Sequence, residues 1–279
     1  MKCRSSQAPS YLKSFTTILA LTCFTSLSVV ETYPAEANPG ASLGATHLSV
    51  TPSSTNLALR SRRVVFRLPD RGAPGSREGG AARGGCSPVS ASVDPSPGKK
   101  LTALMPTTNL GYTTVGFPTL FIYVPTTTAT TAEFILQDQN YKEIYKTMMP
   151  LKGTNGIVSF TLPDTGVLSP LEVGKQYHWY FTVVCDADEP SANVSVEGWI
   201  QRIEPSPGLN SNLLKAKPDE RPAVYAEAGI WYEALTALAD LRRTRPNDPI
   251  LAADWTDLLN SVKLDKITAE PLISCCALQ

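Results

Sequence analysis

The stretch Tyr177-His178-Trp179-Tyr180-Phe181-Thr182-Val183-Val184-Cys185 carries the strongest strand pattern in the chain. Its odd-numbered side chains would point to one face of a sheet, and its even-numbered side chains to the other. This period-two run of aromatic and β-branched residues predicts a β-strand. An acidic turn, Asp186–Pro190, follows it. Pro190 belongs in the turn because proline has no amide N–H to donate to a neighbouring strand. We expect Asn193–Ile203 to return as the neighbouring antiparallel strand.

Five more strands are predicted upstream of this pair, with turn residues between neighbours. They are Leu101–Met105, Thr119–Val124, Ala132–Asp138, Glu143–Met149 and Ile157–Leu162. Seven short strands at regular spacing favour a seven-stranded antiparallel immunoglobulin-like β-sandwich over residues 101–204.

The hydrophobic period changes to 3.6 after a polar linker at Pro205–Pro218, and residues 219–273 are predicted to form a three-helix region. The helices are Asp219–Ala228, Trp231–Arg243 and a third that begins at Asp248-Pro249, which supply an N-cap and an initial proline. Their spacing resembles a single tetratricopeptide-like repeat at Tyr225, Gly229, Trp231, Ala234, Leu238, Leu241 and Pro246. Because about three repeats are needed to bury a core, we expect this hairpin to pack on the sandwich, with Leu238, Leu241, Trp255 and Leu258 buried.

The N-terminal residues 1–37 have the pattern of a secretory signal peptide. Basic residues precede an uncharged run, Phe15–Val30, and Ala35-Glu36-Ala37 supplies a small-x-small cleavage site. The alternative is an uncleaved signal anchor. We therefore expect an exported protein, in the periplasm or outside the cell, with no transmembrane segment after cleavage. A flexible leader is predicted at 38–63 and a short tail at 274–279.

Residues 64–100 are predicted to form a Gly/Arg-rich arm and linker. Lys and Arg outnumber Asp and Glu nine to three between Arg60 and Lys100, but from Leu101 onward the acidic residues prevail by 20 to 13. The arm could fold back on the acidic body, meet an anionic partner or remain solvated. No glycine of the arm is followed by Lys-Ser or Lys-Thr, so a phosphate-binding loop is not expected. Arg71 and Arg77 are candidates for a partner surface.

Several segments together resemble domain of unknown function 928, a family from cyanobacteria. They are Arg71-Gly72-Ala73-Pro74-Gly75 with Cys86, Leu101-Thr102-Ala103-Leu104 with Pro106, His178-Trp179-Tyr180-Phe181, Val196-Glu197-Gly198-Trp199-Ile200 and Ala226-Glu227-Ala228-Gly229-Ile230-Trp231-Tyr232. The resemblance extends from Val64 to Ile273. It implies an exported protein without an assigned activity, so it supplies no functional residues.

A disulfide between Cys86 and Cys185 is predicted. Both cysteines survive signal cleavage, both lie in the part that resembles the family, and an exported protein meets an oxidising compartment. Cys185 ends the central strand on its core-facing side, and cysteine is a small apolar residue that is commonly buried. The alternative is that Cys275 or Cys276 takes one of the partners, because spacing alone does not give connectivity.

The chain offers no catalytic constellation that we can identify. His178 is the only histidine of the predicted folded part, and Cys185 is seven residues along the same strand on the opposite face, so the two cannot form a dyad. We expect His178 to be structural, with one hydrogen-bonded nitrogen. Without a C-x-x-C motif, neither a zinc site nor a cofactor is expected. The acidic turn at Asp186–Glu189 is interpreted as exposed rather than as a calcium site.

Trp199 shares its predicted face with Glu197 and Gln201, and a tryptophan on a polar face indicates cover by another element. The helical hairpin is the expected cover and an external partner is the alternative, so Trp199 joins the candidate partner surface. We expect a non-enzymatic interaction or envelope-associated module with a protein partner and no nucleic acid. The rival is a hydrolase or carbohydrate-active protein with a site between sandwich and helices. Binding of an anionic polymer by the arginine arm is a third possibility.

Overall fold

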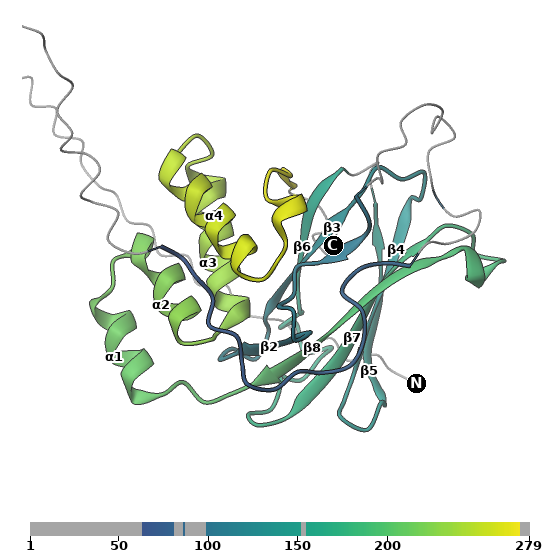
Figure 1. Ribbon diagram of the computed structural model, residues 1–279. Coiled ribbons are helices and arrows are strands. Elements are labelled where there is room, and N and C mark those ends of the chain that lie inside the picture. The colour runs from purple at the N-terminus through teal and green to yellow at the C-terminus, as the bar shows by residue number, and fades with distance from the viewer. Residues whose placement is uncertain (1–62, 81–85, 87–98, 152–154, 274–279) are drawn as a thin grey trace, which may run out of the picture. The chain divides into compact units, whose positions relative to one another are not determined.

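Two β-sheets and four α-helices make up the described part of the computed structural model, which comprises residues 63–80, 86, 99–151 and 155–273 (Figure 1). The five-stranded sheet consists of β2 (Leu110–Thr113), β8 (Val194–Arg202), β7 (Gln176–Val184), β4 (Thr131–Gln137) and β5 (Glu143–Pro150), in that order. The four-stranded sheet consists of β1 (Thr102–Ala103), β3 (Thr119–Val124), β6 (Gly156–Thr161) and β9 (Leu272–Ile273). The fold class is therefore α+β.

Strands β7 and β8 lie at the centre of the larger sheet and pair antiparallel, as the alternation predicts. Trp179 and Phe181 of β7 are buried in the core with Val196 and Ile200 of β8. The two sheets pack against each other through these inward side chains. Phe134 of β4 and Phe160 of β6, for example, have ring centroids 4.7 Å apart.

The prediction of seven purely antiparallel strands is wrong, because two short strands join the sheets in parallel. β2 pairs with β8, and β9 pairs with β6. Neither strand has a pattern of its own: Leu110, Gly111 and Thr113 of β2 are all buried, and β9 has two residues. Both strands are held by their neighbours in space rather than by local alternation.

The helices are α1 (Pro207–Lys215), α2 (Arg221–Glu227), α3 (Trp231–Thr244) and α4 (Pro249–Ser261), with short 3₁₀ turns η2 (Pro190–Ala192), η3 (Pro218–Glu220) and η4 (Asp265–Ile267). Helix α1 occupies much of the predicted linker, so that interpretation is wrong. Ser206 caps it by accepting a hydrogen bond from Leu209 N, and Pro207 stands at its first turn. Leu209 is its one buried residue, too few to form an apolar stripe. No helix in these ranges is both long and apolar enough to cross a membrane.

Helix α3 packs on the sheets, as expected. The Trp231 indole Nε1 donates to the Leu104 carbonyl at 2.8 Å. Gly111 of β2 leaves space for the Tyr232 ring, since a Cβ at position 111 would lie 2.6 Å from a Tyr232 ring carbon. The predicted helix-core residues Leu238, Trp255 and Leu258 are buried. Leu241, also predicted to be buried, is only partly so.

Candidate functional site

A polar and aromatic cluster lies on the outward face of the five-stranded sheet, away from the core. It consists of Tyr141, His178, Tyr180, Glu197 and Trp199, and we call it the outer-sheet cluster. His178 Nε2 lies 2.7 Å from Glu197 Oε2, so the imidazole donates to the carboxylate. The His178 ring stacks on the Trp199 indole at 4.2 Å with an interplanar angle of 7°. The single hydrogen-bonded nitrogen that the sequence predicts is therefore observed, and Glu197 is a partner that sequence reasoning missed.

Trp199 is covered by the arm, and its predicted cover by the helical hairpin is wrong. Its indole Nε1 donates to the Pro74 carbonyl at 3.0 Å, and the Ser76 amide donates to Glu197 Oε1 at 3.1 Å. Gly75 lets the arm approach this closely: its φ is +113°, and a Cβ there would lie 2.6 Å from the Glu197 carboxyl carbon. Only 6% of Trp199 is exposed, so this side chain does not form an open partner surface.

Burial lowers the pKa of His178, and the hydrogen bond and negative charge of Glu197 oppose that shift without cancelling it. Nδ1 is buried and has no hydrogen-bond partner in the described part of the chain. A second ring proton would therefore lie on a nitrogen that lacks an acceptor, which favours neutral imidazole. The cluster thus contains a buried histidine paired with a partly buried Glu197, and Glu197 and Trp199 bind the arm.

The depressed pKa of His178 predicts a loss of stability in mild acid. Its folded-state pKa lies below the unfolded value of about 6.5, so the unfolded chain binds the proton more readily. The contribution of neutral His178 to the stability of the fold is therefore complete above pH ~6.5, and it is lost as the pH falls through the lower folded-state pKa. His178→Phe keeps a ring on Trp199 but does not titrate. Urea unfolding at about pH 7.5 and about pH 5 should show a smaller loss for this variant than for the wild type. Equal losses would contradict the assignment.

Of the two candidate arginines, Arg77 is docked and Arg71 is exposed. The Arg77 guanidinium donates to three backbone carbonyls, of Met105 (2.8 Å), Val262 (2.7 Å) and Lys263 (3.1 Å). Burial lowers its pKa, although Glu78 and Asp265 oppose the shift. The arm therefore folds back on the body at Arg77, and its guanidinium bonds carbonyl oxygens rather than carboxylates. Arg83, another arm arginine, lies outside the described residues.

A disulfide joins Cys86 to Cys185, just beyond the end of β7. It links the arm to the larger sheet beside the acidic turn, and the Cys185 amide donates to Asn193 Oδ1 at 2.8 Å. Cys275 and Cys276 lie outside the described residues.

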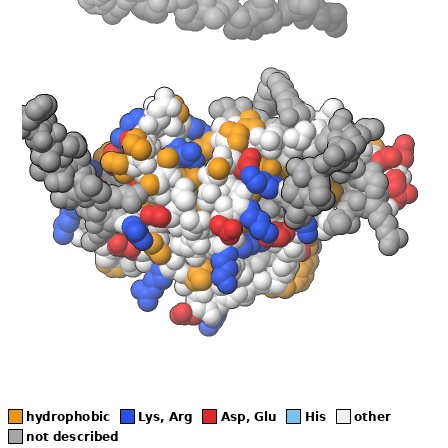
Figure 2. Space-filling model, turned by 45° about the horizontal axis from the view of Figure 1, so that its top comes forward, with side chains coloured by type: hydrophobic (Ala, Val, Ile, Leu, Met, Phe, Trp, Pro, Cys, Tyr) orange, Lys and Arg blue, Asp and Glu red, His pale blue; other side chains and the backbone are white. Residues whose placement is uncertain are grey.

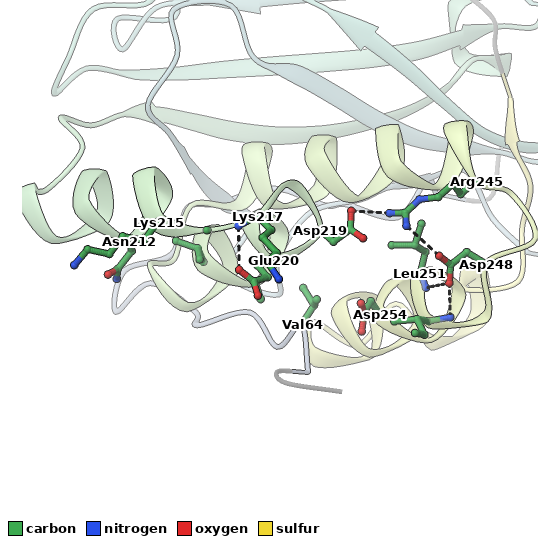
Figure 3. Close-up of a pocket in the computed structure, with 14 residues that line it drawn as sticks. Val64, Asn212, Lys215, Lys217, Asp219, Glu220, Arg245, Asp248, Leu251 and Asp254 are labelled. Carbon is green, nitrogen blue, oxygen red and sulfur yellow. Dashed lines mark hydrogen bonds and ion pairs between the residues drawn. The ribbon is translucent and has the colours of Figure 1, made fainter. Parts of the chain in front are cut away.

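A hollow of about 600 Å³ lies among the helices (Figure 3). Its walls come from the end of α1, from η3 and α2, and from the start of α4, with Val64 of the arm beside them. The lining residues are Val64, Asn212, Lys215, Ala216, Lys217, Asp219, Glu220, Ala223, Val224, Arg245, Asp248, Ile250, Leu251 and Asp254. We call this site the helical hollow.

Three charged side chains of the helical hollow, those of Asp219, Arg245 and Asp248, form ion pairs with one another. Arg245 binds Asp219 at 2.7 Å and Asp248 at 3.4 Å, as Figure 3 shows. A Glu220 carboxylate oxygen accepts from the Lys217 amide at 3.0 Å. Apolar side chains lie between these pairs, among them Ile250, which is 53% exposed. The hollow thus combines apolar contact area with a charged rim, which is a surface suited to a peptide chain.

Positive and negative side chains are mixed on the face of the molecule that Figure 2 shows. On the face in Figure 2, Lys and Arg side chains lie next to Asp and Glu side chains rather than in a separate patch. The charge difference between the arm and the body along the sequence is thus not repeated as two patches on this face. Such a mixed face gives an anionic polymer no continuous basic track.

The sequence analysis did not identify the helical hollow. Asp248 was interpreted as a helix cap, which it is, because its side chain accepts from the Ile250 amide at 2.9 Å. The same carboxylate also faces Arg245, a second role that the local pattern does not show. The available indication was the group of acidic residues just before two of the helices: Asp219 and Glu220 precede α2, and Asp248 precedes α4.

Comparison with known proteins gives one match. The family model described as Domain of Unknown Function (DUF928) matches residues 78–272. That range includes all four helices and both sheets except Ile273, the last residue of β9. No curated protein and no solved structure matches the chain. Since the family model covers more than half of its length, this chain belongs to the DUF928 family.

Proposed function

We propose that this protein is an exported, non-enzymatic interaction module that binds a protein partner through the helical hollow. One observation carries the proposal: the arginine and two carboxylates of the hollow pair with one another instead of converging on an empty point. Arg245 is held by Asp219 and Asp248. An enzyme site needs polar groups aimed at a reacting atom, whereas a docking surface needs apolar area with a polar rim.

The rival proposal, a hydrolase or carbohydrate-active protein with its site between the sheets and the helices, finds less support. Large side chains fill that junction. Trp231 and Tyr232 are buried there, and the Trp179 indole donates to the Tyr232 hydroxyl at 3.2 Å. Burial raises the pKa of Tyr232 far above its usual value, so this hydroxyl stays protonated. The arrangement is that of a packed core.

The finer fold assignment and the localisation belong to the same proposal. We infer an immunoglobulin-like sandwich extended by two parallel strands, and a tetratricopeptide-like pair in α2 and α3. Buried Trp231, Ala234 and Leu238 at that repeat's spacing support the second assignment. Export from a cyanobacterium to the periplasm or beyond is supported by the Cys86–Cys185 disulfide, because such bonds persist in oxidising compartments. The signal peptide proposed at 1–37 lies outside the described residues.

Site-specific photo-crosslinking of the full-length protein in its native compartment tests the function. A photoreactive amino acid at Ile250 should give one discrete protein adduct, because this exposed side chain lines the hollow. The same group at Met148, which is similarly exposed on β5, is the matched control and should not give that adduct. No adduct at Ile250, or the same adduct from both positions, would refute the proposal.

A further inference from the structure

The segment Arg63–Leu68 lies against the helices as an extended peptide would. Its burial alternates: Val64 and Phe66 are 2% and 5% exposed, whereas Val65 between them is 49% exposed. Alternate side chains of an extended chain point in opposite directions, so this segment inserts every second residue between α2 and α4. We call the surface that receives it the helical groove, formed by Ala226 of α2, Trp231 of α3, and Asp257 and Ser261 of α4.

Main-chain and apolar contacts hold the segment in the helical groove. The Phe66 amide donates to Ser261 Oγ at 3.1 Å, and the Arg67 amide donates to the Ala226 carbonyl at 3.0 Å. The Phe66 ring meets the Trp231 ring edge-on, with centroids 4.8 Å apart. Almost any peptide can form the main-chain hydrogen bonds, whatever its sequence. The pockets for alternate side chains determine which sequences bind.

The helical groove continues into the helical hollow. Val64 belongs to both, because it is seated between the helices and also lines the hollow. In Figure 3 it lies between Glu220 on one side and Asp254 on the other. Among the described residues, the segment fills the groove from Val64 to Arg67, and the hollow lies next to Val64. A longer peptide in the same place would find further contact surface there.

Charge also favours a basic segment. Four carboxylates line the hollow, at Asp219, Glu220, Asp248 and Asp254, against three cations at Lys215, Lys217 and Arg245. A fifth carboxylate, Asp257, lies 3.9 Å from the guanidinium of Arg63. A segment that places arginines beside its apolar residues, as Arg63 and Arg67 do, matches this surface.

We propose that the helical groove recognises extended segments of the pattern Arg-apolar-x-apolar, and that Arg63–Leu68 occupies it as an intramolecular ligand. The partner presents a segment of the same pattern, displaces Arg63–Leu68 and extends into the hollow. This inference rests on the proposed function, partner binding at the helical hollow, and it specifies the chemistry of the segment that is bound. A built-in ligand lowers the apparent affinity for the partner, because only the displaced fraction of the protein can bind.

A peptide supplied in trans tests this inference. The probe is a fluorescent heptapeptide with the sequence of Arg63–Pro69, and its control carries Asp at the positions of Val64 and Phe66. The protein is the full chain, as wild type and as the double variant Val64→Ala, Phe66→Ala. Fluorescence anisotropy should show that the probe binds the double variant at least about tenfold more tightly than the wild type. The Asp-containing control should bind at least about tenfold more weakly than the probe. Equal binding of probe and control, or no binding to a folded double variant, would overturn the proposal.

Hydrogen exchange on the wild-type chain decides the question if the double variant does not fold. Excess probe should accelerate exchange of the Phe66 and Arg67 amides, since displacement frees both from their acceptors. The Asp-containing control should leave both rates unchanged, and unchanged rates with the probe itself would refute displacement. The photo-crosslink at Ile250 is independent of this result. An adduct there without displacement would leave the binding function standing and reject only the built-in ligand.

Discussion

Replacing Trp231 by alanine is expected to lower the free energy of unfolding by about 3–5 kcal/mol. The side chain is fully buried and lies where α3, the arm and the loop after β1 meet. Its removal leaves a large cavity and strips Phe66 of its ring contact. It also leaves the Leu104 carbonyl without its indole donor, which adds the cost of an unpaired buried acceptor. Urea unfolding followed by circular dichroism gives the difference.

Two further variants separate the parts of this effect. Trp231→Phe retains most of the ring volume but loses the donor, so it should fall between the wild type and Trp231→Ala. Leu214→Ala is the surface control, because Leu214 is 89% exposed on α1, and it should change stability by less than about 0.5 kcal/mol. A loss below about 1 kcal/mol for Trp231→Ala would mean that α3 does not depend on this contact.

Removing the disulfide is expected to have an effect of similar size. Cys86 and Cys185 are 99 positions apart, and closing a loop of that length is worth about 4.7 kcal/mol in the chain-entropy treatment. The double variant Cys86→Ala, Cys185→Ala should therefore unfold at a much lower urea concentration than the wild type. The effect arises mainly in the unfolded chain, which regains the freedom that the bond removes.

A reducing agent supplies the internal control for this prediction. It should destabilise the wild type to about the level of the double variant and leave the double variant unchanged. Peptide mapping without reduction should recover Cys86 and Cys185 in one linked fragment. Finding both as free thiols in protein isolated from its native compartment would contradict the assignment.

The sequence predicts those elements whose own side chains carry a period. The alternation in β7 places Trp179 and Phe181 in the core, and the 3.6-residue period of α3 does the same for Leu238. Three elements lack such a period. Helix α1 buries only Leu209, and β9 is two residues long. Strand β2 contains Gly111, whose missing side chain leaves room for the Tyr232 ring. Partners distant in the sequence define these elements, so no local window shows them.

The sites illustrate the same limit. Alternation places both His178 and Glu197 on the outward face, but their contact depends on the register across the turn between β7 and β8. That register sets Tyr180 opposite Glu197 and His178 opposite Trp199, so the His–Glu contact is diagonal. The helical groove was not predicted. Val64, Val65 and Phe66 form a continuous apolar run in the sequence, and only the structure shows that Val65 is exposed and that helices receive the other two.

The pairing of β9 with β6 has a consequence for the order in which the molecule can assemble. Ile157 is a partner of Leu272, and all four helices lie between them in the chain. The smaller sheet therefore stays incomplete until a growing chain has passed residue 272. Contacts of such long sequence separation form slowly, because the intervening loop must be closed first. Late completion of this sheet would keep the chain incompletely folded for longer, and an incompletely folded chain is what the export proposed above would require.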